Sequence, residues 1–367
     1  MRKKLSKNIE WSILICTVLL VVIGLFAIYS ATLSSGQEEF RKQTIWLIVS
    51  IPLTIAVFFI DYSFMSKISP FLYGVSIIML ILVLFTAPIG GASSWFSFKS
   101  FSFQPSEFAK IFLILFLSWL MSIMKRKGVK ELNRFTRLLL LMVVFAVPVG
   151  LIIMQPDYGT AMAFVVAFVF MLFNSGIYKR YIIISIIIVA IALPLAYMYI
   201  LPDHAKSRIQ VYLNPDLDPR GAGYNINQSE LAIGAGELTG MGYLQGNQTQ
   251  LGYLYPKSTD FIFAVIGEEM GFIIAALVIV LYCLLITRAI YVAKTAKDDL
   301  GSIIAAGIAG IFFFHMIENI GMTMGLLPIT GVPLPFVSYG GSSLLSNLIM
   351  IGLLLNISGR RQKTIFA

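Results

Sequence analysis

Long apolar segments follow one another along almost the whole chain, each close to the length of a membrane-spanning helix. A helix needs about 20 mostly apolar residues to cross the hydrocarbon core of a bilayer. Short polar or Gly- and Pro-containing breaks separate the segments, which lie at 11–31, 44–60, 71–87, 107–124, 138–155, 158–174, 181–200, 260–287, 302–325 and 340–357. The pattern predicts an all-α integral membrane protein of about ten transmembrane helices, forming a single polytopic membrane domain over residues 1–367.

Residues 201–259 form the longest connection, between the seventh and eighth predicted helices. Connections without structure of their own rarely exceed about 15 residues unless they are functional or disordered. This one is rich in Tyr, Leu and Ile interleaved with Gly, a composition that argues against disorder. We expect short helices and tight turns packed on the membrane surface, and we expect the working site at this large loop.

The segment 327–343, between the ninth and tenth predicted helices, carries no charged residue. It contains several Gly and Pro residues, so it does not continue either helix. Non-helical backbone at membrane depth is tolerated only where it is buried in protein or lines a cavity. We therefore expect this segment to fold back toward the helix bundle.

Charged residues make up only 12% of the chain, against about a quarter in a soluble domain, and the basic ones are unevenly distributed. If the N-terminus is cytoplasmic, the loops on that side carry Lys67, Lys125, Arg126, Lys127, Lys130, Arg134, Arg137, Lys179, Arg180, Arg288, Lys294, Lys297, Arg360, Arg361 and Lys363. The opposite short loops hold only Arg41, Lys42 and Lys99. Because basic loops stay inside, we expect both termini in the cytoplasm and residues 201–259 outside. The net charge of +9 then matches anionic lipids, and nucleic-acid binding is a poor interpretation of it.

The sequence lacks the motifs of several other chemistries. It has no Gly-Lys-Ser/Thr phosphate loop and no dinucleotide fingerprint, so we expect no nucleotide or organic cofactor, and ATP-driven transport has no support. Cys16 and Cys283 lie inside apolar segments as packed, inert thiols, and they give neither a disulfide framework nor a metal-ligand spacing.

Glu107 and Lys110 are candidates for function because a charge inside a membrane span costs at least about 2.5 kcal/mol to insert. They lie one turn apart at the start of the fourth predicted helix, just after Pro105. One interpretation is a helix start with a local ion pair. The other is anion capture, because the unpaired N–H groups of a helix start and a lysine both attract negative charge.

Asp260 lies where the large loop meets the eighth predicted helix, following Lys257, Ser258 and Thr259. An acid beside Ser and Thr in a first helical turn can simply cap the helix. The same position would let Asp260 reach the headgroup of a membrane-bound substrate. Glu268 and Glu269 follow about 12 to 13 Å deeper along the helix, where they must face protein or trapped water, and we favour structural hydrogen bonding for them.

A further polar group lies in the ninth predicted helix, where His315, Glu318 and Asn319 share one face by their spacing. Two such ligands could begin a metal site, but no third ligand is close in sequence, and we favour an interhelical polar contact. In the turn 155–159, Asp157 either stabilises the turn or contributes to the site as a secondary candidate.

Several of these motifs together resemble the SEDS family of shape, elongation, division and sporulation proteins. The resemblance is carried by 104–110 (Gln-Pro-Ser-Glu-Phe-Ala-Lys), 155–160, 228–236, 259–269, 331–336 and 338–343 (Ser-Tyr-Gly-Gly-Ser-Ser), which occur in family order. The runs 319–323 and 333–336 look more like the elongation type, RodA, than the division type, FtsW. His315 stands where the elongation type often has Gln, so no family role is carried onto it.

The resemblance implies a peptidoglycan glycosyltransferase of the bacterial cytoplasmic membrane, acting in cell elongation and shape maintenance. Such proteins polymerise lipid II at the outer face into β-1,4-linked glycan strands and release undecaprenyl diphosphate. It also implies a class B penicillin-binding protein, the transpeptidase, as partner, together with other membrane proteins of the elongation complex and no nucleic acid. The family aspartate corresponds to Asp260, its tryptophan to Trp95, and the Glu and Lys of the fourth helix to Glu107 and Lys110.

An α-linked donor and a β-linked product indicate a single inverting displacement, which needs a base and, for a diphosphate leaving group, cations rather than a second carboxylate. Asp260 would deprotonate the acceptor hydroxyl or hold a divalent cation, Mg or Mn, near the diphosphate, and both interpretations stay open. Lys110 and Arg208 are candidate phosphate holders. Two other functions also stay open, a lipid II flippase and a non-catalytic scaffold for wall-synthesis enzymes, although the outer position of the best candidates favours the enzyme.

Overall fold

Helices long enough to cross a membrane dominate the chain. The computed structural model describes residues 9–88, 92–98, 101–181, 203–214, 217–219 and 221–361, together with 183, 184, 187 and 198. Among these residues, nine helices have the length and apolar composition of membrane spans: α2 (Trp11–Ala31), α3 (Glu38–Phe59), α4 (Tyr62–Val83), α5 (Pro105–Arg126), α7 (Phe135–Met154), α8 (Tyr158–Ser175), α13 (Ile262–Thr295), α14 (Asp299–Thr323) and α15 (Gly341–Arg360). The predicted multi-pass helical membrane protein is confirmed. The seventh predicted span, 181–200, falls almost entirely outside the described residues.

Two predicted helix starts were wrong by more than a turn. α3 begins at Glu38 rather than 44, and its first turn carries Glu38 and Glu39, which the positive end of the helix dipole favours. α4 begins at Tyr62 rather than 71, because Asp61 caps it through a 2.8 Å bond from the Ser63 N–H and the helix continues through Pro70. A proline inside a span is tolerated where neighbouring groups satisfy the freed carbonyl, so it did not mark the boundary.

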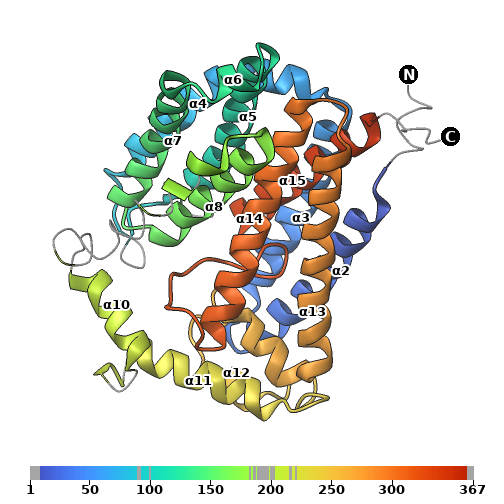
Figure 1. The fold of residues 1–367 in the computed structure, drawn as a ribbon. Helices are drawn as coiled ribbons and strands as arrows, with labels where there is room; N and C mark the ends of the chain where they lie inside the picture. The colour runs from blue at the N-terminus through green and yellow to red at the C-terminus, as the bar shows by residue number, and fades with distance from the viewer. Residues whose placement is uncertain are drawn as a thin grey trace.

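The remaining elements are short. A 3-10 turn (Leu33–Ser35) links α2 to α3, and α6 (Val129–Leu132) links α5 to α7. The strands β1 (Phe96–Phe98) and β2 (Phe101–Phe103) pair antiparallel and directly precede α5 in the sequence. Phe and Ser alternate in both strands, but three residues are fewer than the about 4 to 8 over which alternation indicates a strand, and this hairpin was not predicted from the sequence. The described part of the large loop contains α10 (Asp203–Leu213), α11 (Ala222–Ala235) and α12 (Asn247–Gln250), which lie below the bundle at the end opposite α6 (Figure 1).

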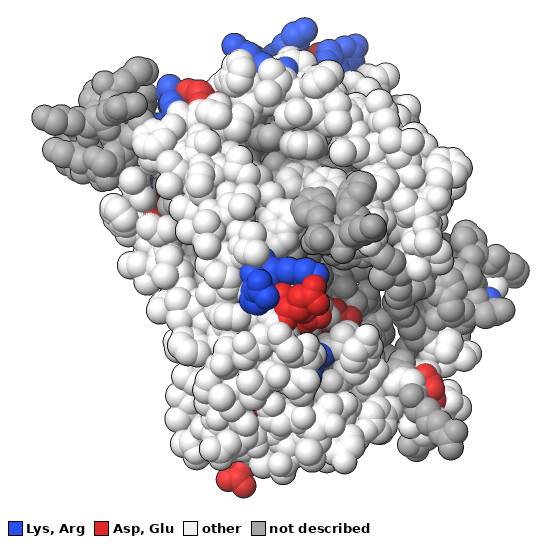
Figure 2. All heavy atoms as spheres, turned by 180° about the vertical axis from the view of Figure 1, so that it is seen from behind, with Lys and Arg blue, Asp and Glu red and all other residues white. Residues whose placement is uncertain are grey.

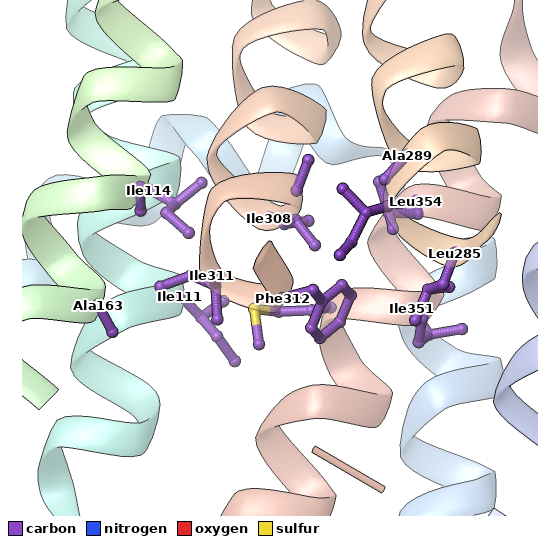
Figure 3. Close-up of a cluster of buried hydrophobic side chains, with 14 of the residues drawn as sticks. Ile111, Ile114, Ala163, Leu285, Ala289, Ile308, Ile311, Phe312, Ile351 and Leu354 are labelled. Carbon is purple, nitrogen blue, oxygen red and sulfur yellow. The ribbon is translucent and has the colours of Figure 1, made fainter. Parts of the chain in front are cut away.

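α14 is the centre of the bundle. It packs against α8, α13 and α5, and α15 packs against α3. Ile308, Ile311 and Phe312 of α14 lie between side chains of α5 and α8 on one side and of α13 and α15 on the other (Figure 3). A Cβ on Gly310 would lie 2.8 Å from the Cα of Ala167, so this glycine lets α8 approach closely. Small residues at contacts are how membrane helices gain packing energy, since lipid is as apolar as their side chains.

One end of the bundle is closed by ion pairs and is rich in basic residues. Glu10, just before α2, pairs with Arg288 at 3.4 Å and with Arg361 at 3.2 Å, which brings the start of α2 and the end of α15 to the same end of the bundle. Lys and Arg side chains gather over the end that carries α6 (Figure 2). This uneven distribution is the physical basis for the orientation expected from the sequence.

α13 is not the continuous span that the apolar pattern predicted. It begins at Ile262, and its backbone leaves the helical region at Gly271, where φ is 76° and ψ is −179°. Residues of the large loop fill the break: the Met241 N–H donates to the Glu268 carbonyl at 2.9 Å, and the Phe272 N–H donates to the Glu237 carbonyl at 2.9 Å. Segment 237–242 thereby satisfies helix carbonyls and N–H groups that the break would leave unpaired.

Candidate active site

The uncharged segment between α14 and α15 folds back into the bundle, as predicted. Its apolar side chains Val332, Leu334, Phe336 and Val337 are at most 3% exposed. Polar groups of three helices hold its backbone. The Tyr282 hydroxyl of α13 donates to the Pro335 carbonyl, His315 Nδ1 of α14 lies 3.0 Å from the Pro333 carbonyl, and Gln43 of α3 bonds both Ser338 and Gly340. We call residues 328–340 the re-entrant segment.

Asp260 lies in the turn before α13, against this re-entrant segment. α13 begins at Ile262 and its N-cap position is Phe261, so Asp260 precedes the cap and does not occupy it. Asp260 is therefore not the N-cap residue of α13. A Cβ placed on Gly331 would lie 3.5 Å from Asp260 Oδ2, so the absence of a side chain at Gly331 keeps space beside the carboxylate. Asp260 is partly buried.

Three other parts of the fold, namely α8, α14 and the re-entrant segment, meet near the Asp260 turn. Thr330, next to Gly331, donates to Glu318 Oε1 of α14 at 2.7 Å. A Cβ placed on Gly159, in the turn that starts α8, would lie 3.1 Å from Thr330 Oγ1. The first turn of α8, the last turns of α14, the re-entrant segment and the Asp260 turn thus converge, although α8, the Asp260 turn and α14 are far apart in sequence. His315, Glu318 and Asn319, which the spacing placed on one face of α14, bond the re-entrant segment and the Asp260 turn rather than a neighbouring helix.

Asp157 performs the turn-stabilising role that the sequence allowed. Its Oδ1 accepts from the Thr160 N–H at 3.2 Å, which caps α8, and its Oδ2 accepts from Gln104 Nε2 at 3.1 Å. Burial raises the pKa of Asp157 above its ordinary value. Through Gln104, Asp157 is connected to the start of α5. A second role for Asp157, as a substrate-binding residue of the site, stays a prediction.

Glu107 and Lys110 form the local ion pair, with Lys110 Nζ 2.8 Å from Glu107 Oε2. The Ser346 hydroxyl of α15 also donates to Glu107. Both charged side chains are almost fully buried, at 2% and 1% exposure, so neither reaches a surface. His315 lies within electrostatic range of both charges. The pair lies in the bundle near Asp157, whose carboxyl also interacts with Glu107.

The other charged candidates have different surroundings. Lys257 Nζ donates to the Thr249 carbonyl at 2.7 Å and to Ser34 Oγ at 3.1 Å, and burial lowers its pKa. Trp95 is partly buried directly before β1, and Arg208 lies on α10, with a side chain outside the described part of the structure. The roles of Trp95 and Arg208 stay predictions.

Glu268 and Glu269 are structural, as favoured from the sequence. Glu268 accepts from the N–H groups of Gln248 and Thr249 at 2.6 and 3.0 Å, and from the Thr249 hydroxyl at 2.6 Å. Glu269 accepts from the Leu244 N–H at 3.1 Å and from Gln250 Nε2 at 2.8 Å. The two carboxylates therefore anchor residues 244–250 of the large loop on α13, next to the helix break.

Sequence reasoning missed Gln43, Thr330, Ser338 and Ser346, which carry much of the polar contact around the site. Gln43 was hidden because the predicted span began at 44. The three hydroxyl residues are ordinary in composition, and their partners are 12 to 239 residues away in sequence.

Comparisons with known proteins agree with this architecture. The family model of the FtsW, RodA and SpoVE cell cycle proteins matches residues 10–363. The peptidoglycan glycosyltransferase MrdB of Escherichia coli K12 is 35% identical over 352 residues, covering 94% of each chain. The peptidoglycan glycosyltransferase RodA of Treponema pallidum is 31% identical over 437 residues, covering 98% of this chain and all of the relative.

Solved structures give the same result. A chain from a peptidoglycan synthase complex that coordinates polymerization and crosslinking matches with a TM-score of 0.82 at 27% identity, over 95% of this chain and 97% of that one. The rod shape determining protein RodA of Thermus thermophilus matches with a TM-score of 0.71 at 25% identity, over 97% and 98%. With a family model over nearly its whole length and relatives above 30% identity, this chain belongs to the FtsW/RodA/SpoVE family, the SEDS family that its motifs resemble.

Proposed function

We propose that this chain polymerises lipid II into β-1,4-linked glycan strands at the outer face of the cytoplasmic membrane, with Asp260 as the carboxylate that acts on the substrate. The chain is a peptidoglycan glycosyltransferase, the activity named for MrdB and RodA. The observation that supports Asp260 is its place: it lies outside the helix cap, partly buried, in the turn where the large loop enters the bundle. A membrane-anchored headgroup approaching from the large-loop side would meet this turn.

The chemistry requires one base. Inversion at the sugar carbon proceeds by a single displacement, in which the acceptor hydroxyl oxygen forms the new C–O bond. The old bond between that carbon and the diphosphate oxygen breaks, and its electron pair leaves with the diphosphate. Asp260 would take the hydroxyl proton as this happens. Acid–base groups positioned in this way raise a reaction rate by about 10²- to 10⁴-fold.

A divalent cation, Mg or Mn, is the other role proposed for Asp260. No group of three or more His, Cys, Asp or Glu side chains in the described part of the chain could hold a metal ion by itself. Mg²⁺ is commonly bound by one or two carboxylates together with substrate phosphates, so Asp260 fits a cation shared with the diphosphate. Such an ion would neutralise charge on the leaving group.

The leaving diphosphate also needs fixed positive charge, for which Lys110 and Arg208 are the proposed side chains. In this structure Lys110 is paired with Glu107 and buried, so direct contact with a phosphate would require the pair to open. Without such an opening, Lys110 acts at a distance, because its charge is poorly screened inside a bundle. Trp95 and Asp157 complete the proposed substrate-binding residues.

A class B penicillin-binding protein is the proposed partner. The chain resembles one member of a peptidoglycan synthase complex. Its large loop exposes apolar side chains that a partner would cover: Leu231, Leu238, Leu251, Tyr253 and Tyr255 are each at least 48% exposed. We also propose that the basic end of the bundle is cytoplasmic, that both chain termini are on the cytoplasmic side, and that other elongation-complex membrane proteins bind the apolar outer surface of the helices.

The direct test uses the purified chain, with and without its partner, in detergent and in vesicles. Labelled lipid II should be converted to glycan polymer on the side that carries the large loop. Movement of lipid II across the vesicle membrane without polymer would support a flippase instead, and binding of partners without either activity would support a scaffold.

A further inference from the structure

The turn that carries Asp260 is held by hydrogen bonds to three successive main-chain carbonyls. The Tyr339 N–H donates to the Ser258 carbonyl at 2.9 Å. The Ser338 hydroxyl donates to the Thr259 carbonyl at 2.7 Å. Asn319 Nδ2 donates to the carbonyl of Asp260 itself at 2.9 Å. All three donors belong to the re-entrant segment or to α14, which precedes it.

Asn319 has a special place among these donors. Its side chain is fully buried, and the same Nδ2 also donates to the Val332 carbonyl of the re-entrant segment at 2.9 Å. One amide therefore fixes the Asp260 turn relative to the backbone next to Gly331, the residue without a side chain beside the Asp260 carboxylate. A buried amide in an apolar helix is costly unless it is bonded, so both N–H groups are used where they set this relation.

The re-entrant segment is itself held in place by several hydrogen bonds. Ser338 Oγ accepts from the Leu334 N–H at 2.8 Å, so the same hydroxyl closes a turn within the segment and bonds the Asp260 turn. Gln43, His315 and Tyr282 hold the segment from three helices. The position of Asp260 is consequently tied to α14 and the re-entrant segment by these bonds, and Asp260 is not the N-cap residue of α13.

We propose that Asn319 is a positioning residue for the glycosyl transfer: it acts through the main chain of Asp260 and fixes where that carboxylate stands relative to the re-entrant segment. The inference rests on the proposed role of Asp260. It differs from an ordinary interhelical contact, because such a contact would affect folding without a selective effect on turnover. A misplacement of about 1 Å in a reacting group can lower a rate by about 10²-fold, so loss of this bond should appear in kcat.

The test is the Asn319→Ala variant of the full chain, purified with its partner where activity requires it, with lipid II as substrate. The matched control is Asn356→Ala. Asn356 is equally buried, and its Nδ2 also bonds main-chain carbonyls, those of Val57, Phe58 and Ile60, but it lies near the opposite end of α15 from the re-entrant segment. Both variants are compared for melting temperature in detergent, and kcat and KM are measured on the folded fraction.

We expect Asn319→Ala to lower kcat by about 10- to 100-fold with KM for lipid II within about twofold, while Asn356→Ala changes kcat by less than about twofold. Ser338→Ala, a smaller change at the neighbouring bond, should lower kcat in the same direction, and it decides the question if Asn319→Ala does not fold. Equal kcat in the Asn319, Ser338 and Asn356 variants would overturn the inference. Asp260→Asn is measured beside them: if it stays active, the proposed role of Asp260 fails, whereas if it is inactive and Asn319→Ala matches its control, only the positioning role fails.

Discussion

Lys110 Nζ lies 2.8 Å from Glu107 Oε2 with both side chains buried near the start of α5, whereas Lys42 and Glu38 make a pair of nearly the same length, 2.7 Å, on an exposed helix face. Breaking a buried pair leaves an uncompensated charge and costs about 3 to 5 kcal/mol, while exposed pairs contribute about 0 to 1 kcal/mol. The same substitution should therefore destabilise the protein more at the buried pair than at the exposed pair.

We expect Lys110→Met to lower the free energy of unfolding by about 3 to 5 kcal/mol and Lys42→Met to lower it much less, because water screens the exposed pair. The double variant Glu107→Gln with Lys110→Met should recover part of the loss, because no unpaired charge remains. Thermal unfolding in detergent measures this. Equal destabilisation by the Lys42 and Lys110 variants would contradict the buried pairing.

The break in α13 predicts a second effect. Gly271 has a backbone conformation that essentially only Gly adopts, and a Cβ there would meet the Gly240 N and the Leu238 carbonyl. Gly271→Ala should cost about 1 to 3 kcal/mol and loosen residues 237–250 from the bundle. Thermal unfolding measures the loss of stability, and limited proteolysis of the large loop measures the loosening of these residues. The control is Gly74→Ala, where a Cβ meets nothing within 4 Å, and it should change stability by less than about 1 kcal/mol.

Orientation is tested by reporter fusions. The basic residues of α5 to α7 predict that a fusion after Lys127 reads cytoplasmic, and one after Arg360 should agree with it, because Arg361 pairs with Glu10 near the start of α2. A fusion at Gly236 should read external. A cytoplasmic signal there would move the Asp260 turn to the wrong side of the membrane for lipid II polymerisation.

The proposed partnership predicts a complex of the two proteins that stays together in detergent. A class B penicillin-binding protein should co-purify with the chain and raise its polymerisation rate. Changing the exposed Leu251 and Tyr253 of the large loop to Ser should weaken that complex, because burial of apolar surface is the dominant favourable term in most protein–protein association. Leu139→Ser, on the exposed face of α7, is the comparison. A polymerisation rate unchanged by the partner would contradict activation by it.

Much of the fold was readable from the sequence, because the thickness of the bilayer fixes how long an apolar helix must be. Most described spans therefore fall close to the predicted ones, with errors at the starts of α3 and α4 and at Gly271, which gave no warning of a break. Glycine is common inside membrane helices, so its presence did not distinguish a break from a close contact.

The candidate site was only partly predictable, for a different reason. Asp260, Asp157, Glu107 and Lys110 stood out as charged residues near apolar segments. Asn319 was singled out, but its partner could not be known, since the Asp260 carbonyl lies 59 residues earlier in the chain. Ser338 and Thr330 carry no charge, and although Ser338 lies in a motif that carries the resemblance, only the fold of the re-entrant segment shows that both residues hold the site together.

The most direct measurement is lipid II polymerisation by a folded Asp260→Asn protein beside the unmodified chain and a Glu237→Gln control, which removes an exposed carboxylate from the same large loop. Asp260→Asn keeps the shape of the side chain and the main-chain carbonyl bonded by Asn319, so melting temperature and partner binding should be unchanged. If Asp260 acts on the substrate as base or cation ligand, its variant should lose about 10²- to 10⁴-fold in rate while Glu237→Gln stays near the unmodified rate. Near-normal polymer from Asp260→Asn would contradict the account and direct the search for the reacting acid to Asp157 or Glu107.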